Sequence, residues 1–136
     1  MSGPDAGTSD HQQWLARAES CLALARIGRT SPAILFEDLV FYAQQAVEKA
    51  LKAVLVSRAA HFPRTHDIGA LITRVRNAGC SVPDELLPAA QLTPYAVRTR
   101  YPGGPPVTEE DYEAAVQLAE QVVAWVRREL GQLGPA

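Results

Sequence analysis

The chain has 136 residues and a formal net charge of −2 at pH 7, with 13 Lys and Arg against 15 Asp and Glu. This length fits one domain that buries its own core without a disulfide or a metal. The charge lacks the strongly basic balance that is typical of general nucleic-acid binders. Cys21 and Cys80 form no CxxC pair, which predicts free thiols in a reducing compartment. With no apolar run long enough for a membrane span and no signal-peptide pattern, we expect a cytoplasmic protein.

Residues 1–10 are small and polar, and we expect them to form a disordered tail. The stretch Ser9–Gln12 fits a capping box that starts a first helix. Apolar residues then recur at helical spacing and predict one buried face: Trp14, Ala18, Cys21, Leu22 and Ala25. The sequence GRTSP at residues 28–32 ends this pattern.

A second helix is predicted from Ser31, which can cap it, to about Ala60. One face is apolar along its whole length: Leu39, Ala43, Ala46, Val47, Ala50 and Val54. Phe41 and Val56 fall on the opposite side among polar residues, and a helix that is apolar on two sides is usually buried on both. We therefore expect the central helix of the fold here, and a homodimer with Phe41 and Val56 as interface candidates.

A third helix is predicted after Thr65, which is placed to cap it, and Gly79 ends it. Its core face repeats at helical spacing: Ile68, Leu71, Ile72 and Val75. Residues 80–102 are predicted to be a fourth, less regular helical region in which Pro94 kinks or restarts the helix. The following GGPP is predicted to be a hinge or turn.

The last helix is predicted to begin after Thr108, with three acidic residues in its first turn and a hydrophobic staple between Val107 and Tyr112. Its core stripe is Tyr112, Ala115, Val116, Ala119, Val123, Val126 and Leu130. No stretch alternates with a period of two. We therefore predict an all-α fold, an antiparallel up-and-down helical bundle of four long helices plus a short fifth, in a single domain at residues 11–132.

The common patterns of catalysis are missing from the sequence. The three histidines do not cluster with Cys, Asp or Glu as metal ligands do, so we expect no metal and no cofactor. GGPP lacks the Lys and Ser or Thr of a phosphate-binding P-loop, and there is no GxSxG. We expect no catalytic residue.

Three residues have two interpretations each at this stage. His66 follows Thr65 and is either a helix-start residue that bonds a neighbouring loop or a site histidine. Lys49 and Lys52 share one side of the second helix and either contact phosphate or form a solvated edge. In the second case, Glu48 and Asp67 are available as their partners.

Three motifs in order resemble the HEPN family of small bacterial helical domains, over roughly residues 12–128. The run AQQAVEKALKA at residues 43–53 is the strongest match. THDIGAL at 65–71 resembles the Thr-His-Asp segment of the family, and TPYAVRTRYP at 93–102 resembles its Tyr…Arg-Tyr-Pro segment.

The resemblance implies a helical bundle, a dimer built on helical faces and a link to nucleotides. Many such domains are encoded beside a minimal nucleotidyltransferase in toxin–antitoxin pairs, and other branches are metal-independent ribonucleases with an Arg-(x)4–6-His motif. This chain has no histidine after Arg98 and Arg100, which argues against RNA cleavage. By the same resemblance, Arg98, Arg100 and Tyr101 occupy the position of interest, and Lys49 and Lys52 lie on the signature helix.

Three hypotheses follow. The first is a non-catalytic module that binds a nucleotide or RNA, or a nucleotidyltransferase partner, through Arg98, Arg100 and Tyr101, with His66, Lys49 and Lys52 as further candidates. An arginine offers a rigid fork for phosphate and a tyrosine can stack on a base. The second is a ribonuclease toxin with a degenerate motif, and the third is a dimerisation scaffold without a ligand.

Overall fold

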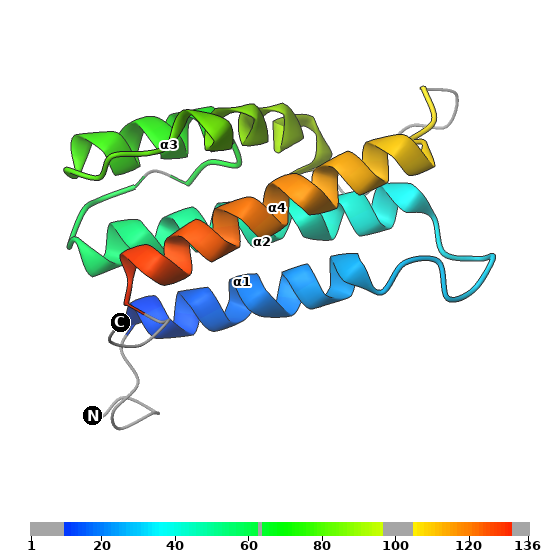
Figure 1. Cartoon of the computed structure of the whole chain (residues 1–136), viewed down its shortest axis with the longest axis horizontal. Coiled ribbons are helices and arrows are strands. Elements are labelled where there is room, and N and C mark those ends of the chain that lie inside the picture. Colours follow the sequence, from blue (N-terminus) through cyan, green and yellow to red (C-terminus); the bar gives the residue numbers. More distant parts are fainter. Residues whose placement is uncertain (1–9, 63, 97–104, 132–136) are drawn as a thin grey trace.

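The computed structural model describes residues 10–62, 64–96 and 105–131. These residues form α1 (Asp10–Arg26), α2 (Phe36–Ser57), α3 (Ile68–Asn77), the 3₁₀ helix η1 (Asp84–Ala96) and α4 (Glu109–Glu129) (Figure 1). The described part of the chain contains no strand, so the predicted all-α helical bundle is confirmed. With 17, 22 and 21 residues, α1, α2 and α4 are long, whereas α3 has 10 and η1 has 13. No helix in these ranges is long and apolar enough to cross a membrane.

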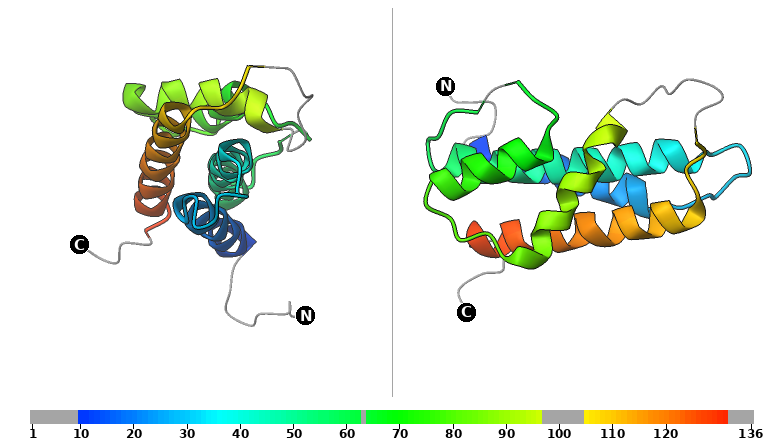
Figure 2. Two further views of the ribbon diagram at one scale, coloured as in Figure 1. Left: turned by 90° about the vertical axis from the view of Figure 1, so that its right-hand side faces the viewer. Right: turned by 90° about the horizontal axis from the view of Figure 1, so that it is seen from above.

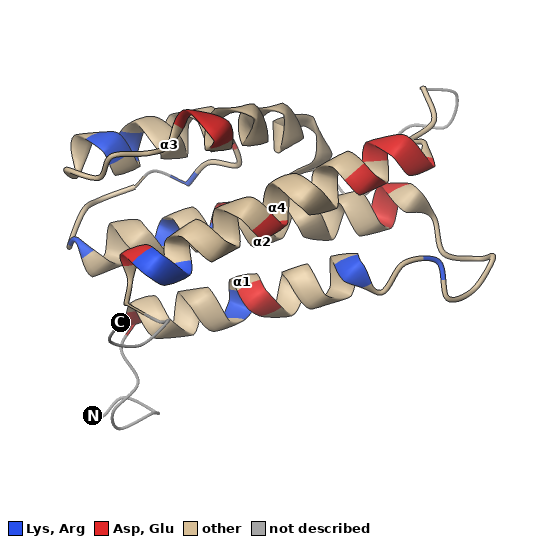
Figure 3. Cartoon of the chain, viewed as in Figure 1, with Lys and Arg blue, Asp and Glu red and all other residues tan. Residues whose placement is uncertain are grey.

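Helix α2 lies at the centre of the bundle. Figure 2 shows it surrounded by α1 on one side, α4 on another, and α3 with η1 on the third. α1 and α2 form an antiparallel pair, and α4 runs in the same direction as α2 (Figure 1). The acidic first turns of α2 and α4 therefore gather at one end of the bundle, where they complement the helix dipoles (Figure 3).

The sequence of α2 explains its position. Thirteen of its 22 residues are buried, and the predicted face from Leu39 to Val54 is buried throughout. The buried alanines Ala43, Ala46, Ala50 and Ala53 let the neighbouring helices approach closely along the middle of α2. The buried set also contains three polar residues spaced four apart, so that they line one face: Gln44, Glu48 and Lys52.

Two of the predicted helix starts are wrong. α2 begins at Phe36 with Leu35 as an N-cap that makes no side-chain bond, because Ser31 Oγ instead accepts a hydrogen bond from the Ala33 amide at 3.2 Å. α3 is capped by Asp67, whose side chain accepts from the Ala70 amide at 3.1 Å. Serine and threonine hydroxyls can close local turns instead of capping a helix, and here they do so.

The C-terminal boundaries also differ in part from the expectation. α2 ends at Ser57 rather than at about Ala60, and Ala59 adopts a positive φ of 53°. α3 ends as predicted before Gly79, whose φ of 98° is accessible to glycine at little cost. The fourth helical region is a 3₁₀ helix that runs through Pro94 to Ala96 without a restart. The predicted cap residue Ser9 lies outside the described residues.

The start of α4 agrees with its prediction. Thr108 Oγ1 accepts from the Asp111 amide at 3.1 Å, and Asp111 Oδ2 accepts from the Thr108 amide at 3.0 Å, which completes a capping box. The Tyr112 hydroxyl donates to the Ala25 carbonyl at 2.6 Å. Four residues of the predicted α4 stripe are fully buried, and Trp125 and Val122 join them.

We predict that Thr108→Ala destabilises the fold by about 1 kcal/mol, the usual cost of losing an N-cap side chain. Urea unfolding followed by circular dichroism measures this loss. Thr108→Ser is the matched control, since it keeps the hydroxyl and should retain most of the stability. Equal stabilities of the alanine and serine variants would contradict the prediction.

The proposed dimer contacts are partly buried within the single chain. Phe41 packs its ring against Tyr42 with centroids 5.4 Å apart, and Val56 is also half-buried. The homodimer therefore stays a prediction.

Candidate functional site

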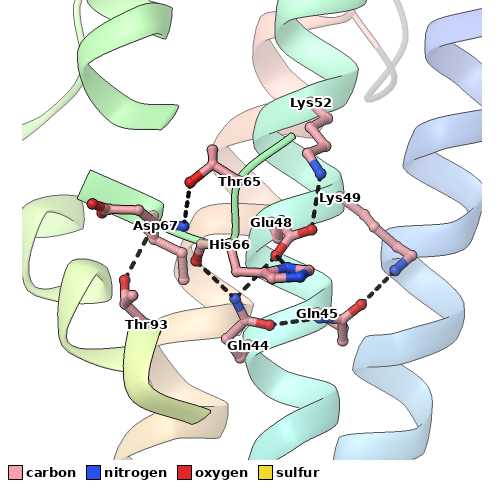
Figure 4. Close-up of polar contacts among 10 residues, drawn as sticks. Gln44, Gln45, Glu48, Lys49, Lys52, Thr65, His66, Asp67 and Thr93 are labelled. Atoms are coloured by element: carbon pink, nitrogen blue, oxygen red, sulfur yellow. Dashed lines mark hydrogen bonds and ion pairs between the residues drawn. The ribbon is translucent and has the colours of Figure 1, made fainter. Parts of the chain in front are cut away.

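The candidate site is a buried polar network on the face of α2 that bears Gln44, Glu48 and Lys52 (Figure 4). Polar side chains in a core need hydrogen-bond partners, because an unpaired buried group costs free energy. Among the described residues, every buried side-chain nitrogen and oxygen has such a partner. The network is therefore fully satisfied and rigidifies the region that it joins.

Glu48 is the centre of the network. Its Oε2 accepts from Lys52 Nζ at 2.9 Å, and its Oε1 is 3.1 Å from the Gln44 amide nitrogen and 2.8 Å from His66 Nδ1. Burial favours the neutral acid and would raise the pKa of Glu48. The hydrogen bonds from Lys52, His66 and Gln44, together with the Lys52 charge, outweigh this effect and hold the pKa of Glu48 below its ordinary value. Glu48 is thus a buried carboxylate at neutral pH.

Lys52 is committed to this carboxylate. Its ammonium nitrogen also lies 5.7 Å from the ring centroid of Trp14 in α1 and 5.5 Å from that of Phe62 in the α2–α3 loop. The two rings meet edge to face at 6.0 Å and cover the ammonium group. Only 11% of the Lys52 side chain is exposed, and its ammonium group contacts residues of α1, of α2 and of the loop.

A chain of hydrogen bonds extends the network towards the surface. Lys49 Nζ donates to Gln45 Oε1 at 2.7 Å, and Gln45 Nε2 donates to Gln44 Oε1 at 2.7 Å. Gln44 Nε2 in turn reaches the His66 carbonyl at 3.3 Å as well as Glu48. Lys49, a half-buried residue, is therefore oriented by the same network as His66.

His66 joins the network from the α2–α3 loop. Thr65 Oγ1 accepts from the Asp67 amide at 3.0 Å, and Thr93 Oγ1 of η1 accepts from the Ile68 amide at 3.0 Å, so both sides of His66 are anchored. Its side chain is nevertheless 66% exposed, whereas that of Glu48 is 5% exposed. Figure 4 shows the imidazole reaching from the loop across α2 towards Gln45. The ring is thus fixed at one nitrogen and open to solvent elsewhere.

The structure unites part of the residue set that the sequence singled out. His66, Lys49 and Lys52 lie in one network, and Glu48 is the partner of Lys52, as the sequence suggested. A solvated edge is the wrong interpretation for Lys52, which is buried. Arg98, Arg100 and Tyr101 lie outside the described residues.

Sequence reasoning missed the central roles of Gln44 and Glu48. The spacing of four between Gln44, Glu48 and Lys52 was an available signal, since it places the three side chains on one helix face. The Trp14–Phe62 pair around Lys52 had no local signal, because the two rings meet only in the folded chain.

The nearby thiol of Cys21 is not activated by the network. Burial raises the pKa of Cys21, and the Lys49 charge only partly opposes this, while the Glu48 charge adds to it. A thiol with a raised pKa is a poor nucleophile at neutral pH. Cys21 and Cys80 are both free, as expected.

Comparison with known proteins gives the family of this fold and network. Residues 11–129 match the HEPN domain. The chain belongs to the HEPN domain family. The match confirms the resemblance to the HEPN family that the three sequence motifs indicated. Two of these motifs, at residues 43–53 and 65–71, contain the residues that bind Glu48.

Two solved structures are similar to this HEPN chain. The crystal structure of TT1696 from Thermus thermophilus has a TM-score of 0.73 at 30% identity and covers 87% of this chain and 96% of its own. The crystal structure of ST0689, an archaeal HEPN homologue, has a TM-score of 0.69 at 24% identity and covers 89% of this chain and 98% of its own, which supports the fold. No curated protein matches the sequence.

Proposed function

We propose that this HEPN domain is a non-catalytic binding module for a phosphate-bearing ligand such as a nucleotide. The observation that carries the proposal is the network around Glu48. Its carboxylate binds the exposed His66 imidazole directly, and it is linked to the Lys49 ammonium through Gln44 and Gln45. A buried carboxylate that orients an exposed imidazole is costly to build, and such arrangements are more common at functional sites than elsewhere.

Phosphate suits the groups on this face. The ammonium of Lys49 has three N–H donors, of which one is used by Gln45, and the imidazole of His66 adds its outer nitrogen. By the family resemblance, Arg98, Arg100 and Tyr101 are additional candidates, through a guanidinium fork on phosphate and a ring stacked on a base. The resemblance also supports a homodimer, a nucleotidyltransferase partner and a toxin–antitoxin context.

The ribonuclease alternative lacks its expected acid–base residue, because His66 is the last histidine in the sequence and precedes both arginines. The scaffold alternative accounts for a dimer but gives no reason for an oriented, exposed imidazole in the same network as a lysine.

We predict that nucleoside phosphates raise the melting temperature of the protein, and that Lys49→Met lowers their affinity about tenfold or more. The expected loss corresponds to one charge-assisted hydrogen bond of about 1.5–3 kcal/mol. A thermal-shift screen with AMP, ADP, ATP and inorganic phosphate, followed by calorimetry, measures both effects.

Arg17→Met is the matched control, since Arg17 is an exposed cation on α1 whose loss should leave affinity unchanged. A screen in which no phosphate compound stabilises the protein would contradict the proposal and favour the scaffold. Equal affinities of the parent and Lys49→Met would remove Lys49 from the site.

A further inference from the structure

The hydrogen bond between His66 and Glu48 determines which imidazole nitrogen is free. Nδ1 lies 2.8 Å from Glu48 Oε1, and the same carboxylate already receives donors from Gln44 and Lys52. The amide of Gln44 and the ammonium of Lys52 can only donate at these nitrogens. Glu48 thus accepts two hydrogen bonds and has His66 Nδ1 within hydrogen-bond distance as a third partner.

An acceptor-only carboxylate requires a hydrogen on Nδ1. Since the pKa of Glu48 is held below its ordinary value, the carboxylate has no proton of its own to donate at neutral pH. Nδ1 must therefore carry a hydrogen, whether the ring is neutral or charged. Nε2 is then the remaining polar atom of the ring, an acceptor in the neutral form and a donor in the charged form.

The surroundings leave the ring little freedom to reverse this arrangement. The main chain of His66 is held by Gln44 at its carbonyl, and the residues on both sides are fixed by the Thr65 turn and by the bond from the Ile68 amide to Thr93. The side chain is 66% exposed although Nδ1 faces a buried group. Because Nδ1 faces Glu48, we infer that Nε2 lies on the exposed part of the ring.

Building on the binding function proposed above, we infer that Glu48 is a positioning residue that holds His66 with Nε2 towards the ligand phosphate. Lys52, covered by Trp14 and Phe62, keeps the Glu48 carboxylate in place and does not touch the ligand. Nδ1 therefore binds Glu48 and stabilises the fold, whereas Nε2 binds the ligand phosphate.

The first test needs no variant of Glu48. Nitrogen-15 NMR of the full chain at neutral pH reports which imidazole nitrogens bear hydrogen, and the His66 signals are assigned among three histidines by their loss in His66→Asn. We expect a hydrogen on Nδ1 of His66 and a shift of the Nε2 signal on titration with AMP. A neutral ring with its hydrogen on Nε2 overturns the inference.

The second test separates the two nitrogens. The amide nitrogen of asparagine can take the place of Nδ1, and that of glutamine the place of Nε2. His66→Asn should therefore keep the melting temperature near that of the parent and lose AMP affinity about tenfold or more. His66→Gln should retain more affinity but be less stable. If His66→Asn binds AMP as tightly as the parent, His66 is only a partner of Glu48 and the inference is wrong.

The third test examines Glu48 itself. Glu48→Gln should remove the fixed Nδ1 signature and weaken AMP binding about tenfold. Because this variant leaves Lys52 without its carboxylate, the double variant Glu48→Met, Lys52→Met provides a folded background in which the signature should also be lost. A signature that survives in the double variant overturns the positioning role. A further outcome is that the NMR signal of a hydrogen-bearing Nδ1 depends on Glu48 while neither AMP nor inorganic phosphate changes the Nε2 signal or the melting temperature. In that case Glu48 still positions His66, but the ligand contact and the proposed function are both wrong.

Discussion

Replacement of Glu48 by alanine is expected to lower the free energy of unfolding by about 3–5 kcal/mol, the usual cost of removing one partner from a buried ion pair. The variant leaves the Lys52 ammonium in the core between Trp14 and Phe62 without an anion, and it removes the acceptor of Gln44 and His66. A domain of this size has a total stability of about 5–15 kcal/mol, so the loss is a large fraction of it. Urea unfolding at neutral pH measures the effect.

The double variant Glu48→Met, Lys52→Met is the matched control. Exchanging a whole buried ion pair for apolar side chains of similar size is often neutral or stabilising, because no charge is left unpaired. The double variant should therefore be more stable than Glu48→Ala by several kcal/mol. If the two proteins unfold at the same urea concentration with the same slope, the penalty does not come from the unpaired lysine.

The pH dependence of stability offers a second measurement on the same residue. The pKa of Glu48 is lower in the folded chain than its ordinary value of 4.5. Its contribution to stability is thus fully present above that ordinary value and is lost as the pH falls through the lower, folded value. Between these two values, the parent should lose stability with acid more steeply than the double variant, which has no carboxyl group at this position.

Local sequence rules were sufficient for much of the fold. The apolar repeat from Leu39 to Val54 predicted the buried face of α2, and the Thr108–Asp111 pattern predicted the capping box of α4. Both features depend on residues within a few positions of one another. Such patterns act in the same way in almost any helical protein, so they can be recognised without the tertiary structure.

The predicted starts of α2 and α3 are wrong for a reason that is also local. Ser31 and Thr65 are good N-cap residues, but each hydroxyl accepts a hydrogen bond two residues ahead and closes a turn before its helix begins. Sequence alone does not decide between these two uses of one hydroxyl group. Asp67, which the sequence suggests as a partner for the lysines, instead caps α3.

The site could be predicted only in part. His66 and Lys49 stood out through the family resemblance. His66 is held by the carboxylate of Glu48, and Lys49 is joined to the same network through Gln45 and Gln44, whereas the sequence suggested Glu48 only as a partner for the lysines. The rings of Trp14 and Phe62 lie against Lys52, the partner of Glu48, and neither ring is near Glu48 in the sequence. Glu48 and Lys52 look like a solvated i, i+4 pair in the sequence, but contacts that form only in the folded chain bury them.

Truncation of Leu51 to alanine is expected to cost about 2–5 kcal/mol, the range for a buried leucine that leaves a cavity. Leu51 is 1% exposed on α2, which has helices on three sides, so no neighbour can move in without disturbing another contact. Leu24→Ala in α1 is the matched control: it is the same substitution within a helix, but Leu24 is 38% exposed, and its loss should change stability by about 0.5 kcal/mol or less. Urea unfolding of both variants gives the comparison. A central helix that is packed on three sides predicts a difference of at least about 2 kcal/mol between them. Equal losses of stability in the two variants would mean that α2 is less tightly packed than its burial indicates. The packing of α2 would then give no rigid support to Glu48.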